Sequence, residues 1–409
     1  FFFFFNDTAT TEIYTLSYTT LFRSVAKEFL MTATTNRRHL LGGLGALAAT
    51  AFVPSAQAAS GQKPRVVDIP DIVQMRTLGS GTAAMHVTAL GFGCMGMSYH
   101  RSETPDATML KRVVAQAYDL GVNFFDTAQV YGRVRAQNEK FVGQAIAPFK
   151  NRIQVATKFG FVFDEHEKKI EGRFDSRPEN IRRVCEESLK NLGIEAIDLF
   201  YQHRFDPAVP VEDVAGTVAN LIKEGKVKHF GMCEVGPNTI RAAHKECPVT
   251  AIQSEYHLMW REPETKVFPV LQELGIGFVP YSPLNRGFLG GTVNEYTQFD
   301  VTNDNRHTLP RFTPQALRAN YRIVEVLNHF GRTHGMTSSQ IALLWMLDKA
   351  DWIVPIPGTT KLSHLEENLR SLDFKVSRTE WTELEKQVAA VDIVGDRYPA
   401  EQQNQINSN

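Results

Sequence analysis

The stretch FFDTAQVYGRVRAQNE (residues 124–139) decides how the rest of the chain is interpreted. It opens with apolar residues, as a buried strand does, and turns polar at Asp126, five residues before Tyr131. A segment rich in arginine and glutamate then begins, in a pattern typical of a helix. A buried strand that leads directly into a helix is one unit of a repeated strand–helix fold.

The same unit recurs along residues 89–358. Apolar residues at helical spacing, as at 109–120, 181–192 and 211–222, separate short strand-like runs. These eight runs are ALGFGCMGM, NFFDTA, IQVATKF, IDLFYQH, VKHFGMCE, AIQSEY, GFVPYSP and WIVPIPG. Strands that are apolar at nearly every position indicate a parallel sheet buried on both faces. The sequence therefore predicts an α/β fold, the (β/α)8 TIM barrel.

Segments outside the repeat are expected to close and cover this barrel. Two short strand patterns in residues 74–90, joined through Gly79-Ser80-Gly81, predict an N-terminal β-hairpin at the barrel floor. The loops at 161–174 and 285–312 follow strands and are expected to determine substrate specificity. Extra C-terminal helices are predicted at residues 314–334, at residues 337–347 and from about Ser377 onward.

Composition limits the classes of partner. The 409 residues are 43% hydrophobic and 22% charged, which is typical of a soluble globular protein with a large core. A formal net charge of −1 gives no electrostatic reason to bind nucleic acid or an anionic membrane, so we expect a small-molecule ligand. The four cysteines lack CxxC spacing and are expected to be buried thiols, and the histidines lack metal-binding spacing such as HExxH. We predict no metal site, and nothing in the sequence indicates an oligomeric state.

The N-terminal region has the layout of an export signal. Arg37 and Arg38 precede an apolar run at 40–53, which is shorter than the roughly 20 residues of a membrane-spanning helix. Ala56-Gln57-Ala58 has the small-residue pattern of a cleavage site. This layout resembles a twin-arginine-type signal peptide, so we expect an exported or periplasmic protein without a membrane anchor after cleavage. The alternative is a cytoplasmic protein.

The predicted domain organisation follows from these segments. Residues 1–30 resemble translated adaptor read-through and are predicted to be an artefactual or disordered leader. The remaining segments are a signal peptide at 31–58, a linker at 59–73, the barrel at 74–395 and a polar tail at 396–409.

Four side chains at neighbouring strand ends suggest a reaction. Active sites of such barrels lie at the carboxyl ends of the strands, where Asp126, Lys158 and His203 stand, with Tyr131 just after the second strand. Singly, each could be a cap or a packed core residue. Together, Asp126 would hold Lys158 charged, and the lysine would lower the pKa of Tyr131 below its ordinary value of about 10. Tyr131 could then protonate a carbonyl oxygen to which His203 donates a hydrogen bond, but hydride would require a nicotinamide cofactor.

These motifs resemble those of the aldo-keto reductase superfamily over residues 74–372. Its catalytic tetrad falls on Asp126 and Tyr131 in FFDTAQVYG, Lys158 in ATKFG and His203 in LFYQHR. The resemblance implies reversible NAD(P)H-dependent reduction of aldehydes or ketones to alcohols. It also implies cofactor contacts from Glu234, Gln253, Tyr281, Ser282, Leu284, Arg286, Gly358, Thr359, Lys361, Glu367 and Asn368.

The resemblance implies a role for each group of cofactor residues. Glu234 and Gln253 would bind the nicotinamide carboxamide and Tyr281 would stack on its ring, whereas Ser282, Leu284 and Arg286 would approach the pyrophosphate. Thr359 and Lys361 would lie near the 2′-phosphate, and Glu367 and Asn368 near the adenine. Relatives often have Ser-Asn at Cys233-Glu234, a basic residue at Gly358 and arginine at His364. These departures leave Lys361 as the main cation for a 2′-phosphate, on which the expectation of NADPH rests, with NADH as the alternative.

Two other interpretations compete with this one. GFGCMG (residues 91–96) matches the G-x-G-x-x-G fingerprint of a Rossmann dehydrogenase, but no helix is predicted to open at its last glycine. In the second alternative, the protein has the same barrel but does not turn over a substrate significantly, and it acts as a cofactor-sensing binding module.

Overall fold

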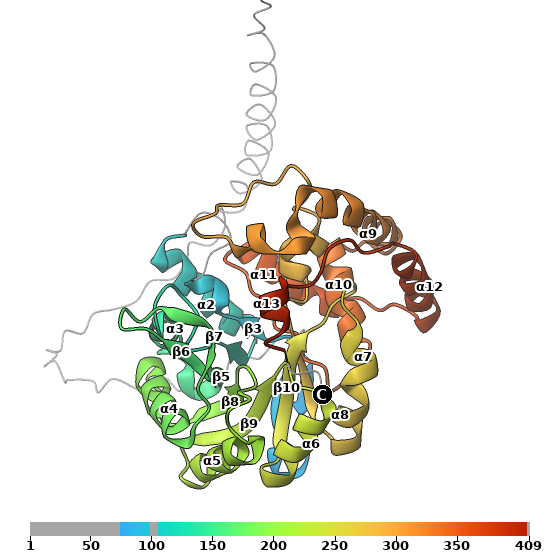
Figure 1. Ribbon diagram of the computed structural model, residues 1–409. Helices are drawn as coiled ribbons and strands as arrows, with labels where there is room; N and C mark the ends of the chain where they lie inside the picture. The colour runs from blue at the N-terminus through green and yellow to red at the C-terminus, as the bar shows by residue number, and fades with distance from the viewer. Residues whose placement is uncertain (1–73, 99–104, 407–409) are drawn as a thin grey trace, which may run out of the picture. The chain divides into compact units, whose positions relative to one another are not determined.

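A parallel sheet forms the centre of the protein. The computed structural model describes residues 74–98 and 105–406 (Figure 1). Within them, strands pair in the order β11-β10-β9-β8-β5-β4-β3, and every neighbouring pair is parallel. Their bounds are β3 Phe92–Gly93, β4 Phe124–Asp126, β5 Gln154–Phe159, β8 Ile197–Gln202, β9 Val227–Cys233, β10 Val249–Glu255 and β11 Gly277–Tyr281.

The eighth predicted strand closes this sheet into a barrel without being a regular strand. On one side, the amides of Val354 and Ile356 donate to β11 carbonyls at 2.9 and 3.1 Å. On the other side, the carbonyls of Pro355 and Pro357 accept from Gly91 and Gly93 at 2.9 and 3.2 Å. The prolines lack the amides that a full ladder toward β3 would use, so only their carbonyls take part. The predicted (β/α)8 barrel is confirmed.

Helices cover the outside of the strands (Figure 1). In α4 the buried positions Ile181, Val184, Cys185, Ser188 and Leu192 follow helical spacing, so one face packs on the sheet and the other meets solvent. The helices are α2 Ala107–Asp119, α3 Gln137–Ile146, α4 Pro178–Leu192, α5 Val211–Lys223, α6 Pro237–Glu246, α7 Glu262–Lys266, α8 Phe268–Leu274, α9 Pro314–His334, α10 Ser338–Leu347, α11 Leu362–Leu369, α12 Arg378–Ala389 and α13 Ala400–Gln403. Among the described residues, no helix has the length and apolarity needed to cross a membrane.

The predicted hairpin at the barrel floor is present. Strands β1 (Met75–Leu78) and β2 (Met85–Thr88) are antiparallel. Leu78 packs so closely on the start of β11 that a Cβ added at Gly277 would lie 2.4 Å from its side chain. Thr250, near the start of β10, donates its hydroxyl to the carbonyl of Ala83 at 2.9 Å. The hairpin therefore closes the amino ends of the strands and leaves their carboxyl ends open.

Segments at the carboxyl ends differ from simple loops. Residues 161–174 form a hairpin of β6 (Phe161–Phe163) and β7 (Lys169–Phe174). Residues 285–312 contain three short 3-10 helices, Asn285–Gly290, Asn305–Thr308 and Pro310–Phe312.

The four cysteines are free and buried, as predicted. The predicted leader, signal peptide and linker lie outside the described residues.

Candidate active site

The four predicted catalytic side chains meet at the carboxyl ends of β4, β5 and β8. Lys158 Nζ lies 2.5 Å from Asp126 Oδ1 and donates to the Tyr131 hydroxyl at 3.1 Å. The same nitrogen donates to the Thr127 carbonyl at 2.8 Å, so its three protons have three acceptors. The His203 ring stands edge-on to the Tyr131 ring, with centroids 5.7 Å apart. Lysine therefore links the acid to the phenol, as the sequence predicted.

Burial changes the expected electrostatics of the phenol. Burial lowers the pKa of Lys158, but the charges of Asp126 and Tyr131 outweigh it, and the pKa lies above its ordinary value. For Tyr131, burial raises the pKa by more than the charge of Lys158 lowers it. The expected net lowering of the Tyr131 pKa is therefore wrong. Tyr131 holds its proton at neutral pH, and Lys158 stands where it can stabilise the phenolate once the proton has left.

His203 is a neutral imidazole at neutral pH. Burial lowers its pKa well below the ordinary value, and the positive charges of Lys158, Arg204 and Lys169 lower it further. Its Nδ1 is buried and has no hydrogen-bond partner among the described residues. A neutral imidazole carries one N–H donor and one acceptor. His203 can therefore donate a hydrogen bond to a carbonyl oxygen but does not offer a positive charge.

The two predicted carboxamide partners already have partners of their own. Gln253 Nε2 donates to Asp126 Oδ2 at 2.8 Å, so this amide lies directly beside the pair of Asp126 and Lys158. Glu234 forms a two-point ion pair with Arg397, and its Oε1 also accepts from the Glu255 amide at 2.8 Å. Burial raises the pKa of Glu234, but the charge of Arg397 outweighs burial and the pKa lies below its ordinary value.

A buried charge network surrounds the predicted nicotinamide position. Arg397 is 4% exposed and also donates to Glu255 Oε2 at 2.8 Å and to the Tyr281 hydroxyl at 2.9 Å. Arg286 makes a two-point ion pair with Glu255 at 2.8 and 3.0 Å and donates to the Tyr398 hydroxyl at 3.0 Å. The predicted pyrophosphate ligand Arg286 is thus engaged with a carboxylate.

Arg397 and Tyr398 were not predicted as site residues, since the sequence places them in the polar tail. Their C-terminal segment enters the mouth of the barrel, where the Tyr398 hydroxyl lies 2.9 Å from that of Tyr281. The sequence feature that could have indicated a missing cation is the pair of carboxylates at Glu234 and Glu255, each at the end of an apolar strand. A carboxylate buried there requires a cation nearby. That signal does not say which cation supplies the charge.

The loop after β11 has a strained backbone. Ser282, Asn285 and Arg286 have φ values of 51°, 45° and 55°, in the left-handed region that residues other than glycine seldom adopt. Leu284, between them, is partly buried against the core. Such conformations cluster at active sites and ligand clamps. The loop therefore fits the predicted contact with a dinucleotide.

The five predicted residues of the adenosine end lie on and after the segment that closes the barrel. A Cβ at Gly358 would meet the Gly93 carbonyl oxygen at 2.6 Å, which excludes the basic side chain found in relatives. The Thr359 hydroxyl accepts from the Lys361 amide at 3.1 Å, and the exposed Lys361 side chain has no ion-pair partner among the described residues. In α11, Asn368 is buried, and Glu367 accepts from the Thr337 hydroxyl at 2.7 Å.

The first two glycines of residues 91–96, Gly91 and Gly93, serve close packing. A Cβ at Gly91 would lie 2.9 Å from the Ile356 side chain, and one at Gly93 would lie 2.8 Å from the Ile356 carbonyl oxygen. These glycines let β3 approach the closing segment, and a 3-10 helix (Met95–Met97) follows them instead of a Rossmann helix. The Rossmann interpretation is therefore excluded.

Comparison with known proteins identifies the family. Residues 89–389 match the model of the Aldo/keto reductase family. The chain is 41% identical over 327 residues to the Glycine max protein named "Probable aldo-keto reductase 1", covering 80% of this chain and 92% of the relative. The chain belongs to the aldo/keto reductase family. It is therefore an NAD(P)H-dependent oxidoreductase acting on small carbonyl or alcohol substrates.

Two solved structures resemble this aldo/keto reductase in fold. The glycerol dehydrogenase from Gluconobacter oxydans matches with a TM-score of 0.69 and 24% identity, covering 80% of this chain and 99% of that one. The holo form of an aldo-keto reductase from Bacillus halodurans matches with a TM-score of 0.62 and 24% identity, covering 78% and 98%. Likenesses at this identity show the fold alone.

Proposed function

We propose that this aldo/keto reductase converts aldehydes or ketones to alcohols, with Tyr131 as the proton donor. The observation that carries the proposal is the position of Lys158 Nζ, 2.5 Å from Asp126 and 3.1 Å from the Tyr131 hydroxyl. A bound nicotinamide cofactor supplies hydride to the carbonyl carbon. Tyr131 gives its proton to the carbonyl oxygen, which leaves a phenolate beside the ammonium group of Lys158.

The remaining residues keep Lys158 charged, orient the substrate carbonyl and hold the cofactor. Asp126 keeps Lys158 charged, because an ammonium group buried without an anion would tend to lose its proton. His203, being neutral, donates a hydrogen bond to the carbonyl oxygen and fixes the direction of the carbonyl. Tyr281 and Gln253 would hold the nicotinamide, and the strained loop at Ser282 would approach the pyrophosphate.

Turnover with NADPH and para-nitrobenzaldehyde tests the proposal. Loss of NADPH absorbance is expected for the wild type, and Tyr131→Phe should lower kcat by about 10²- to 10⁴-fold, the usual contribution of a general acid. NADPH binding, measured by fluorescence, should persist in Tyr131→Phe. Tight NADPH binding without turnover on a broad panel of carbonyl compounds would instead support a cofactor-sensing module.

We also propose NADPH as the preferred cofactor. The support is Lys361, an exposed cation without an ion-pair partner among the described residues, beside the Thr359 hydroxyl. Because a hydrogen bond to a charged group contributes about 1.5–3 kcal/mol, Lys361→Met should lower kcat/KM for NADPH by roughly 10- to 100-fold. The same variant should leave kcat/KM for NADH nearly unchanged, and Lys375→Met serves as the control. Equal losses for both cofactors would contradict the proposal.

Export remains a proposal based on the sequence of residues 31–58 alone. It predicts a mature N-terminus near Ala59. Mass spectrometry of the protein from its native host measures this directly, and an intact chain starting at Met31 would contradict export.

A further inference from the structure

A polar cavity of about 440 Å³ lies near the predicted catalytic residues, although Tyr131 and His203 do not themselves line it. Its wall includes Phe161, whose ring meets the His203 ring edge-on with centroids 5.0 Å apart. Arg204, the residue after His203, and Arg133, two residues after Tyr131, also line it. Ligand pockets are commonly about 300–1,000 Å³, so the cavity suits a small substrate.

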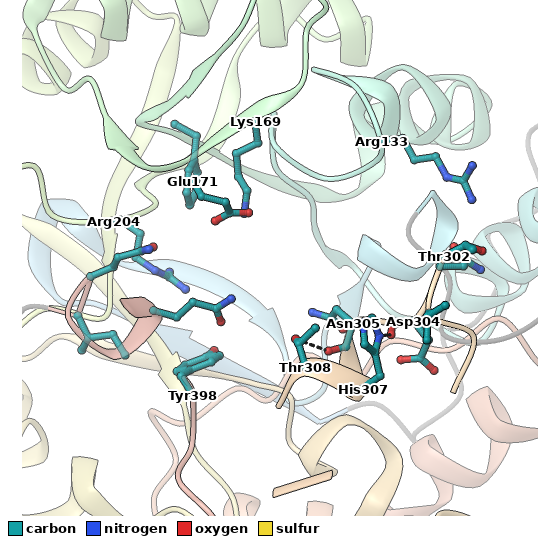
Figure 2. A pocket seen from close by; sticks show the side chains of 16 residues that line it. Arg133, Lys169, Glu171, Arg204, Thr302, Asp304, Asn305, His307, Thr308 and Tyr398 are labelled. Carbon is teal, nitrogen blue, oxygen red and sulfur yellow. Dashed lines mark hydrogen bonds and ion pairs between the residues drawn. The ribbon is translucent and has the colours of Figure 1, made fainter. Parts of the chain in front are cut away.

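Three segments distant in sequence surround this cavity. Figure 2 shows Lys169 and Glu171 of β7 on one side, Thr302 to Thr308 of the long loop on another, and Tyr398 of the C-terminal segment beside Arg204. The two loops predicted to determine specificity therefore face the same space. Lys169 and Arg204 both extend toward its centre (Figure 2).

The charges in the wall do not cancel. Lys169 is paired with Glu171 at 2.6 Å, and the buried Asp304 is paired with Arg306 at 2.6 Å. Arg204 donates one hydrogen bond, to the carbonyl of His203 at 2.7 Å. Among the described residues, neither Arg204 nor Arg133 has a carboxylate within ion-pair distance. The cavity therefore has an excess of positive charge next to the catalytic residues.

Arg204 is better placed to bind a ligand than to compensate the charge of a carboxylate of the protein. Burial lowers the pKa of Arg204, but Tyr281, Tyr398 and then Glu234 outweigh burial and hold the pKa above its ordinary value. Glu234 is already held at two points by Arg397, so it does not require a second cation. Arg204 is only partly buried, and most of its five N–H donors have no acceptor within the part of the chain that the structure describes.

We propose that this cavity binds the carboxylate of an anionic carbonyl substrate and that Arg204 is the residue that binds it. The inference rests on the proposed reduction by Tyr131 and specifies its substrate class. A guanidinium group fits a carboxylate with two parallel hydrogen bonds. Glu171 and Asp304 also line the cavity, so its surplus charge suits a monoanionic carboxylate better than a dianionic phosphate.

A pair of substrates that differ in charge tests this specificity. For the full-length enzyme with NADPH, the value of kcat/KM should be roughly tenfold or more higher for para-carboxybenzaldehyde than for its methyl ester. Arg204→Met should lower this ratio by roughly 10- to 100-fold, the range for a charge-assisted hydrogen bond. Arg204→Lys should retain part of the preference. Arg182→Met, an exposed arginine of α4 paired with Glu224, is the matched control and should leave the ratio unchanged.

The outcomes separate this inference from the proposed function. A wild-type ratio near one, or a ratio that Arg204→Met leaves unchanged, would overturn the inference while turnover of the ester upholds the reductase. If neither aldehyde is turned over, the proposed reduction fails. Calorimetry with para-(hydroxymethyl)benzoate then tests the proposed carboxylate site separately. Binding to the wild type that Arg204→Met abolishes would support the site. No binding, or equal binding to the wild type and to Arg204→Met, would refute it.

Discussion

Removing Arg397 should strongly destabilise the protein. Arg397 is 4% exposed, and its guanidinium group bridges Glu234 and Glu255, with a further hydrogen bond to the Tyr281 hydroxyl at 2.9 Å. In Arg397→Met, Glu255 keeps its two-point pair with Arg286, but Glu234 loses its ion-pair partner. Breaking a buried ion pair from one side costs about 3–5 kcal/mol, because a buried charge is left uncompensated. A typical domain has only about 5–15 kcal/mol of stability in total.

The loss should depend on pH in a defined direction. In the wild type the pKa of Glu234 is held below its ordinary value, so its stabilising contribution is present above the unfolded pKa and is lost as the pH falls through the folded pKa. Without Arg397, burial of Glu234 is opposed only by the charge of Arg204 and the hydrogen bond from the Glu255 amide, so we expect its pKa to rise above that of the unfolded chain. The variant should then gain stability as the pH falls, so its deficit relative to the wild type should be smaller at about pH 5 than at about pH 7.

Urea denaturation at the two pH values measures both effects. Glu234→Gln in the Arg397→Met background removes the uncompensated charge and should recover a large part of the lost stability. Arg241→Met, which breaks an exposed pair with Glu273, is the matched control and should change little. An Arg397→Met protein within about 1 kcal/mol of the wild type, or one whose deficit grows at low pH, would refute the reasoning.

Three further predictions address the core and the tetrad. Gly231→Ala places a Cβ 2.5 Å from the buried Tyr201 ring and should lower the free energy of unfolding by about 1–3 kcal/mol in urea denaturation; an unchanged midpoint would contradict this packing. Because the pKa of His203 is well below its ordinary value, kcat/KM for a neutral aldehyde should show no ionisation near pH 6.5, and an inflection there would indicate a charged imidazole. Asp126→Asn removes the counter-charge of Lys158 and should lower kcat by about 10²- to 10⁴-fold; activity within tenfold of the wild type would argue against the acid's role.

The barrel and the grouping of the four proposed catalytic side chains were predictable because both follow from short-range patterns. Buried parallel strands are apolar at nearly every position, and Asp126, Lys158 and His203 stand where such runs end. The segment that closes the barrel, residues 352–358, was predicted as a strand from its apolar residues. Pro355 and Pro357 prevent it from forming a regular strand. The β6–β7 hairpin was not predicted, since β7 is largely exposed and lacks the apolar run that reveals a buried strand.

Properties that depend on distant contacts were not predictable in the same way. The direction of the Tyr131 pKa depends on how deeply packing desolvates the phenol, which charge spacing alone does not reveal. The pairing of Arg397 with Glu255 and Glu234 spans 142 and 163 residues, and no local pattern marks it. The sequence places Glu234 directly after β9 and Arg286 in the loop after β11, but it does not reveal their ion-pair partners.

The position of Arg397 has a consequence for synthesis. A ribosome makes Glu234 and Glu255 well before it makes the arginine that bridges them. Until that arginine emerges, Glu255 can pair with Arg286, but Glu234 must remain hydrated or take up a proton, so the mouth of the nascent barrel cannot settle into its final form. Proteolytic clipping ahead of Arg397 would return a mature molecule to that incomplete condition while sparing every catalytic side chain.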